Sequence, residues 1–154
     1  MEVSVIIPTY NRKRFLKEAI LSVLNQTYKH FELIIYDDGS NDGTDELIRS
    51  FKRFYDFKYI FSHENRGPSY ARNRAVENAN GEFIAFLDSD DLWTKNKLKI
   101  QMEYMKKNNC SICQTEEIWI RNGKIVNPMI KHTKPSGFIF ERCLELCVVS
   151  PSSV

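Results

Sequence analysis

The chain has 154 residues, the size of one domain, with 42% apolar and 27% charged residues. This balance is that of a globular protein, and it excludes a collagen, a coiled coil or a disordered chain. With 22 basic and 20 acidic residues the net charge is +2, which argues against a nucleic-acid-binding protein. Two basic clusters, at residues 12–14 and 95–99, are interpreted as solvated helix faces.

The apolar runs are as short as β-strands, far below the roughly 18 residues that cross a membrane. Met1 and Glu2 lead directly into a predicted core strand, without the pattern of a signal peptide. We therefore expect a cytoplasmic protein that is folded from its first residues.

Four cysteines, Cys110, Cys113, Cys143 and Cys147, lie in the last third of the chain. Their C-x2-C and C-x3-C spacing loosely fits a zinc site. Their apolar neighbours favour reduced, buried thiols instead, because free cysteine is among the most buried residue types. A zinc protein remains an alternative that metal analysis would test.

Short apolar runs alternate with stretches of helical periodicity along most of the chain. In chain order we predict strand 3–8, helix 14–26, strand 31–36, helix 44–54, strand 58–61, helix 69–80, strand 83–87 and helix 94–107. Pro68 suits the start of the third helix, and Gly81 is expected to end it. Beyond these, we predict strands at 112–114 and 118–120 and a hairpin turn at Asn122-Gly123, while 137–149 is ambiguous and fits a short helix.

Successive β–α units predict an α/β fold, with a mostly parallel sheet and helices on both of its faces. Ligands bind such sheets at the carboxyl ends of the strands. Polar clusters follow three predicted strands, at residues 8–12, 37–40 and 88–91. These three strand ends are the candidate functional site.

The acidic segment 88–91, D-S-D-D, is the first candidate within this site. The chain has neither a G-x-G-x-x-G motif after its first strand nor a P-loop, so a bound diphosphate would need another source of positive charge. A divalent cation held by one or two carboxylates supplies it. The alternative is that Asp90 or Asp91 only caps the following helix.

Asp37 and Asp38 form a second acidic pair. A buried carboxylate at this position could accept the ring N–H of uracil or guanine, and Tyr10 could stack on the base. The alternative is a simple turn built with Gly39. Arg72 or Arg74 could reach a phosphate, although either alone is more typical of a surface residue.

Four segments resemble motifs of the family 2 glycosyltransferases, in order and in spacing. They are VIIPTYNR at 5–12, DDGSNDGT at 37–44, ENRGPSYARN at 64–73 and GEFIAFLDSDD at 81–91. The resemblance covers residues 1–108 well and residues 109–154 only as a partial start of the acceptor-binding half. We expect one domain over 1–154, with the Rossmann-like GT-A fold of that family.

The resemblance implies transfer of a sugar from a nucleotide-sugar, by family habit a UDP-sugar, to an acceptor hydroxyl, with inversion and with Mn²⁺ or Mg²⁺. By the same resemblance each motif residue receives a role. Pro8, Tyr10, Asn11, Arg12 and Ser89 border the nucleotide, Asp38 holds the base, Arg72 lies near the diphosphate, Asp88 lies by the ribose and the metal, and Asp90 binds the metal.

The chain departs from the family pattern in its last third, where no acid falls in the motif of the family's general base. We therefore expect a donor-binding half that ends before the acceptor-binding half, with the catalytic base outside it. A glycan or lipid-linked acceptor, peripheral membrane contact and a homodimer are further expectations. The main alternative is a non-catalytic nucleotide-binding module. A receiver-like phospho-switch is set aside, because its paired acids follow the first strand.

Overall fold

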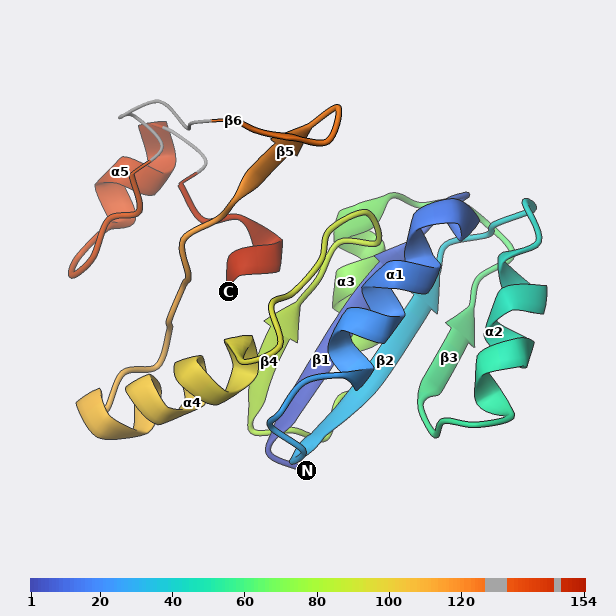
Figure 1. The fold of residues 1–154 in the computed structure, drawn as a ribbon, viewed down its shortest axis with the longest axis horizontal. Coiled ribbons are helices and arrows are strands. Elements are labelled where there is room, and N and C mark those ends of the chain that lie inside the picture. The colour runs from blue at the N-terminus through green and yellow to red at the C-terminus, as the bar shows by residue number, and fades with distance from the viewer. Residues whose placement is uncertain (127–132, 146–147) are drawn as a thin grey trace.

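Four parallel strands form one sheet in the order β3-β2-β1-β4 (Figure 1). The computed structural model describes residues 1–126, 133–145 and 148–154. The strands are β1 (Val3–Thr9), β2 (Phe31–Asp37), β3 (Lys58–Phe61) and β4 (Phe83–Phe86). All residues of β1 are buried, because this strand pairs with β2 on one side and β4 on the other. Its nearly continuous apolar run is what a strand covered on both faces requires.

Helices cover both faces of the sheet. On one face, α1 (Lys13–Leu24), α2 (Thr44–Lys52) and α4 (Lys97–Asn108) share a core cluster with β1 and β2. On the other face lies α3 (Pro68–Val76), whose small residues Ala71 and Ala75 pack with Ile6 and Ile34. This arrangement confirms the predicted α/β class.

The third helix ends earlier than predicted, at Val76 rather than at residue 80. Gly81 therefore does not cap it. Gly81 instead lies against β1, where it donates its N–H to Ser4 Oγ at 2.8 Å. A Cβ at this position would lie 2.5 Å from the backbone nitrogen of Ser4, so only glycine fits without a shift of the backbone. Pro68 is the first residue of α3, as predicted.

The last third of the chain agrees with the sequence in part. β5 (Trp119–Arg121) and β6 (Lys124–Val126) form the predicted hairpin, and Asn122 and Gly123 both have positive φ, as a type I′ turn requires. The ambiguous stretch contains α5 (Phe140–Glu145), and a 3-10 turn, η2 (Pro151–Ser153), follows. The strand predicted at 112–114 is wrong, because this segment belongs to neither sheet of the described residues.

Two other expectations need correction. Lys97 is buried rather than solvated, because its ammonium lies over the Trp93 ring, 4.2 Å from the ring centroid, and contacts Gln101. This burial lowers the pKa of Lys97 to about 8. Cys143 is exposed, and Cys110 and Cys113 are only partly buried, so the predicted burial of the thiols is wrong for Cys143. Cys147 lies outside the described residues.

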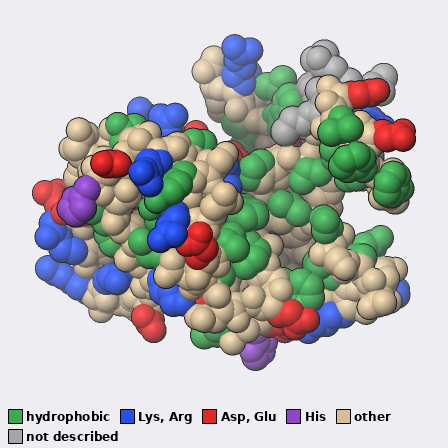
Figure 2. Space-filling model, turned by 180° about the vertical axis from the view of Figure 1, so that it is seen from behind, with side chains coloured by type: hydrophobic (Ala, Val, Ile, Leu, Met, Phe, Trp, Pro, Cys, Tyr) green, Lys and Arg blue, Asp and Glu red, His purple; other side chains and the backbone are tan. Residues whose placement is uncertain are grey.

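Hydrophobic side chains gather at the surface on the side formed by α4 and the segments after it (Figure 2). Those more than two thirds exposed include Ile112, Ile118, Ile120, Ile125, Phe138 and Leu144. Within the described residues, no helix has both the length and the apolar character needed to cross a membrane.

Candidate donor-binding site

The carboxyl ends of β1, β2 and β4 bring the three predicted polar clusters to one edge of the sheet. The first two clusters are joined directly, because Asn11 N–H donates to Ser40 Oγ at 2.9 Å. The first and third are joined by an ion pair, in which Arg12 Nε lies 3.9 Å from Asp90 Oδ2. Residues that are more than 70 positions apart in the chain thus form one site.

Asp38 is buried, with 2% of its surface exposed, and its two carboxylate oxygens differ. Oδ2 accepts the backbone N–H of Arg66 at 2.9 Å and that of Gly67 at 2.7 Å. Gly67 has φ of 92° and ψ of 165°, a conformation nearly confined to glycine. Oδ1 is buried and has no hydrogen-bond partner. The side chain is therefore held by one oxygen and presents the other as a free acceptor.

Asp37, its neighbour, has both oxygens occupied. Oδ1 accepts the N–H of Ser40 at 2.8 Å, and Oδ2 accepts the hydroxyl of Tyr59 at 2.8 Å. Burial and the hydrogen bond to Asp37 raise the pKa of Tyr59. The turn-building interpretation thus fits Asp37, while Asp38 keeps an acceptor free.

Arg72 and Arg74 also differ. Arg72 Nη2 donates to Asp88 Oδ1 at 2.5 Å, and its Nε is buried without a partner. Arg74 pairs with exposed Glu77, the residue that follows the last residue of α3. The exposed pair of Arg74 fits the surface interpretation, and Arg72 is the arginine of α3 that contacts the candidate site.

The three acids of the loop 88–91 have three different partners. Asp88 pairs with Arg72, and Asp90 lies near Arg12. Burial raises the pKa of Asp91, aided by the nearby charges of Asp90 and Asp88 and opposed by a hydrogen bond from Ser152. Among the described residues no three His, Cys, Asp or Glu side chains are grouped as metal ligands. Asp88 and Asp90 nonetheless suit Mg²⁺ or Mn²⁺, hard cations that one or two carboxylates hold together with substrate phosphates.

The remaining predicted residues differ in exposure. Tyr10 is 45% exposed, Asn11 is half-buried, and Ser89 is buried in the acidic loop. Pro8 is buried within β1, opposite Tyr36 of β2. Of these, the ring of Tyr10 has the accessibility that stacking on a base requires.

Sequence reasoning missed Thr9, whose hydroxyl is buried without a partner. Four buried side-chain atoms of the described residues lack a hydrogen bond, and three of them belong to this edge: Thr9 Oγ1, Asp38 Oδ1 and Arg72 Nε. An unpartnered buried polar atom costs about 1–3 kcal/mol, so such atoms tend to mark functional sites. In the sequence, Thr9 lies inside the segment VIIPTYNR and the polar cluster 8–12, but nothing distinguishes it there from its neighbours.

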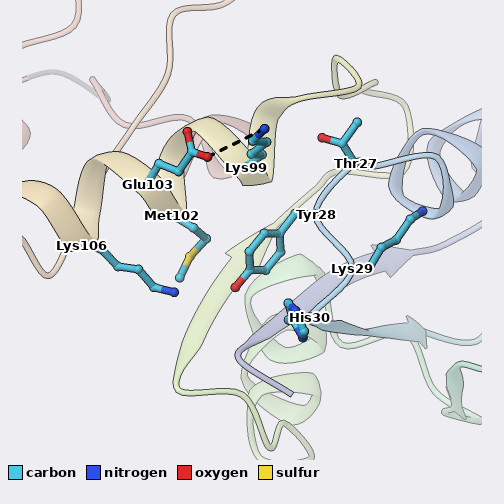
Figure 3. A pocket seen from close by; sticks show the side chains of 8 residues that line it. All are labelled: Thr27, Tyr28, Lys29, His30, Lys99, Met102, Glu103 and Lys106. Atoms are coloured by element: carbon cyan, nitrogen blue, oxygen red, sulfur yellow. Dashed lines mark ion pairs between the residues drawn. The ribbon is translucent and has the colours of Figure 1, made fainter.

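A cavity of about 400 Å³ lies elsewhere, between α4 and the segment that leads into β2 (Figure 3). It is lined by Thr27, Tyr28, Lys29, His30, Lys99, Met102, Glu103 and Lys106. Lys99 pairs with Glu103, and Lys106 pairs with Glu2 at 2.7 Å. Because residues 27–30 precede β2, the cavity lies at the amino edge of the sheet, opposite the predicted site.

Known proteins are similar to this chain in sequence and in fold. A family model described as Glycosyl transferase family 2 matches residues 4–143. The UDP-Glc:alpha-D-GlcNAc-diphosphoundecaprenol beta-1,3-glucosyltransferase WfgD of Escherichia coli is 39% identical over 145 residues, which are 94% of this chain and 56% of WfgD. The uncharacterized glycosyltransferase RC0461 of Rickettsia conorii is 42% identical over 154 residues, and this chain spans only 25% of the length of that protein.

Two solved structures give the same picture. The crystal structure of S. aureus TarS 1-349 in complex with UDP-GlcNAc matches with a TM-score of 0.67 and 33% identity, over 71% of this chain and 32% of that one. The mannosyltransferase PcManGT from Pyrobaculum calidifontis, in complex with GDP-Man and Mn²⁺, matches with a TM-score of 0.64 and 28% identity, over 68% of this chain and 32% of that one. Both the predicted family and the predicted GT-A-like fold are thereby confirmed, and the chain belongs to glycosyl transferase family 2.

Proposed function

We propose that this chain is the donor-binding half of a glycosyltransferase that moves a sugar from a nucleoside diphosphate to an acceptor hydroxyl, with inversion. The observation that carries the proposal is the free oxygen of Asp38, a buried acceptor at the carboxyl edge of a parallel sheet. The nucleotide-sugars bound in the TarS and PcManGT structures, UDP-GlcNAc and GDP-Man, support it.

The base is proposed to be uracil. Its ring N–H would donate to Asp38 Oδ1, while Oδ2 stays fixed by the backbone of Arg66 and Gly67. The half-exposed ring of Tyr10 would stack on the base. Guanine also presents a ring N–H, so the choice between the two bases is a matter for measurement.

The diphosphate is proposed to lie beside Arg72 and the acidic loop. Arg72 offers its unpartnered Nε as a further donor, while Nη2 stays on Asp88. Asp88 and Asp90 would hold Mn²⁺ or Mg²⁺, which when bound supplies positive charge for the leaving nucleotide. The Mn²⁺ named with PcManGT supports this assignment.

The acceptor is proposed to be a hydroxyl of a lipid-linked glycan, reached from the membrane surface, as the name of WfgD suggests for that relative. Inversion requires a base on the acceptor side. We assign that base to no residue of this chain. Glu117, a late acid, is engaged by Lys134 at 3.1 Å and by the Trp119 indole at 3.1 Å. Glu117 therefore lacks the free carboxylate that a base needs. The second candidate function is a module that binds nucleotide without transferring sugar.

The test is calorimetric titration of UDP, GDP and CDP into the chain, with and without Mn²⁺. Asp38→Asn is the informative variant, because its amide oxygen can accept the two backbone N–H groups while its NH₂ replaces the free acceptor by a donor. We expect UDP affinity to fall at least tenfold and CDP, whose ring nitrogen accepts a hydrogen bond, to gain affinity.

The matched control is Asp45→Asn, which changes an exposed acid of α2 that pairs with Arg49. It should bind UDP like the unchanged chain. Asp90→Ala should lose the Mn²⁺ dependence and keep the metal-free affinity. Binding of no nucleotide, or equal UDP affinity in Asp38→Asn, would overturn the proposal. Sugar transfer by the chain in the presence of an acceptor would exclude the second candidate.

A further inference from the structure

The turn η2 packs against the acidic loop 88–91, although the two segments lie more than 60 residues apart in the chain. Ser152 Oγ accepts the N–H of Asp88 at 3.0 Å and donates its own hydrogen to Asp91 Oδ2 at 2.6 Å. One hydroxyl therefore ties the first residue of the loop to the last.

The backbone around Ser152 is itself fixed from several directions. Its carbonyl accepts the indole N–H of Trp93 at 2.8 Å. The carbonyl of buried Ser153 accepts Gln101 Nε2 at 3.1 Å, and that of Val154 accepts the N–H of Phe86 in β4 at 3.3 Å. The turn is therefore held by Trp93, by Gln101 of α4 and by the backbone of β4. These contacts give the hydroxyl of Ser152 a defined position before any ligand arrives.

The acidic loop needs such a brace. Three carboxylates within four residues repel one another, and only one backbone hydrogen bond, from Asp91 N to Asp88 O at 3.1 Å, closes the loop internally. Arg72 and Arg12 face Asp88 and Asp90, the two acids assigned to the cation. Asp91 is the acid that Ser152 engages, so its carboxylate serves to anchor the loop.

We propose that Ser152 is a positioning residue, which braces the loop 88–91 through Asp91 so that Asp88 and Asp90 hold the cation of the diphosphate in one geometry. The inference rests on the proposed donor site. It separates the acidic loop into two ligand acids and one anchor, and it gives the turn η2 a part in donor binding.

The experiment compares Ser152→Ala and Ser152→Thr with the unchanged chain in UDP titrations, with and without Mn²⁺. Ser152→Ala removes the hydroxyl and should reduce the Mn²⁺-supported affinity about tenfold, as loss of a group that orients metal ligands typically does. The metal-free affinity, set by the base, should change less than twofold. Ser152→Thr keeps the hydroxyl and should restore most of the Mn²⁺ effect.

Ser153→Ala is the matched control, because the hydroxyl of Ser153 donates only to the backbone carbonyl of Ser150 in the same turn. It should retain the Mn²⁺ effect even if it lowers the melting temperature. Equal loss in Ser152→Ala and Ser153→Ala, or an unchanged Mn²⁺ effect in Ser152→Ala, would overturn the positioning role.

A second readout does not depend on nucleotide. Hydrogen–deuterium exchange at residues 88–91 should be at least tenfold faster in Ser152→Ala than in Ser153→Ala, because the N–H of Asp88 loses its acceptor. Equal exchange in the two variants would overturn the brace. If exchange accelerates while the unchanged chain binds no nucleotide, the proposed function and the positioning role fail, although the brace itself stands.

Discussion

Arg72 Nη2 lies 2.5 Å from Asp88 Oδ1, so an ion pair joins helix α3 to the loop that follows β4 at the carboxyl edge of the sheet. Both side chains are largely shielded, with 21% and 31% of their surfaces exposed. The pair uses one of the three guanidinium nitrogens, and Nε remains buried without a partner. Arg72 can therefore hold the acidic loop and still donate to a phosphate.

We predict that Arg72→Lys weakens UDP binding about tenfold, because an ammonium can keep the ion pair with Asp88 but cannot donate from a second nitrogen of a planar fork. Uridine, which lacks the diphosphate, should bind the variant and the unchanged chain equally. Arg74→Lys, which alters an exposed ion pair with Glu77, is the control for the same chemical change. Equal losses for UDP and uridine would contradict the assignment of Arg72 to the diphosphate.

Gly67→Ala should weaken UDP binding by about an order of magnitude, because a side chain at φ of 92° strains the backbone by about 1–3 kcal/mol and displaces the N–H that holds Asp38. Gly123→Ala is the matched control. Gly123 also has positive φ, has nothing within 4 Å of an added Cβ, and lies in the exposed hairpin. Both variants should lose stability in urea, but only Gly67→Ala should lose UDP. Unchanged UDP affinity in Gly67→Ala would separate this glycine from the site.

Gly81→Ala should destabilise the fold by about 2 kcal/mol or more, because the new Cβ would meet the backbone of β1 at Ser4. For a chain of this length, a loss of this size lowers the melting temperature by roughly 4–8 °C. Gly137→Ala, at an open position with positive φ, should have a smaller effect. A Gly81→Ala variant with an unchanged melting temperature would show that β1 and β4 can separate at this point without cost.

Glu32 links three segments at the amino edge of the sheet. Burial alone would raise the pKa of Glu32. Hydrogen bonds from Ser4 and from the backbone of Asn80, together with the Lys58 ammonium, outweigh burial and lower the pKa from the ordinary 4.5 to about 2. Between these two values the unfolded chain binds more protons than the folded chain, so stability falls as the pH falls through this window.

We therefore predict that Glu32→Gln destabilises the fold by about 2 kcal/mol at pH 7 and that this difference shrinks below pH 4.5. Urea unfolding at pH 3, 4, 5 and 7 measures it. Glu82→Gln, at an exposed acid on the same edge of the sheet, is the control and should show no comparable difference at any of these pH values. A pH-independent difference for Glu32→Gln would mean that the lost contacts do not depend on its charge.

The exposed apolar side chains of the β5–β6 hairpin lead us to predict self-association of the chain. Ile120 and Ile125 lie opposite each other across β5 and β6 and are 69% and 74% exposed. Burying such a pair against a second copy is favourable by about 25 cal/mol per Å² of apolar surface. We expect the chain to dimerise at high concentration in light scattering and the double variant Ile120→Lys, Ile125→Glu to stay monomeric. A monomer at all concentrations would contradict this prediction.

The positions of the four parallel strands in the sequence were predictable, because apolar runs such as Val3–Thr9 are typical of a buried strand. The site was predictable as a region, since three polar clusters follow strands that end at one edge. The separate roles of Asp37 and Asp38 were not, because they depend on contacts with Tyr59 and with the backbone at Arg66 and Gly67.

Two errors have different origins, one in local partners and one in a distant partner. Lys97 carries the pattern of a surface cluster, yet Trp93 and Gln101 bury it. The segment 112–114 has strand composition, but the backbone beside it bonds to the turn η2, where Thr115 N donates to Ser153 O at 3.0 Å. Periodicity within the segment 112–114 carries no information about the second contact.

β1 pairs with β2 on one side and with β4 on the other, so the two parts of the proposed site come from different stretches of the chain. Every residue of the proposed base pocket lies within the first 67 positions, whereas the acidic loop needs β4 and then Ser152, which follows Asp88 by 64 residues. During synthesis from the N-terminus, the residues of the proposed base pocket are therefore made first, and the brace of the acidic loop is made last. The acidic loop can take its final geometry only after α4 and the turn η2 have packed beside it.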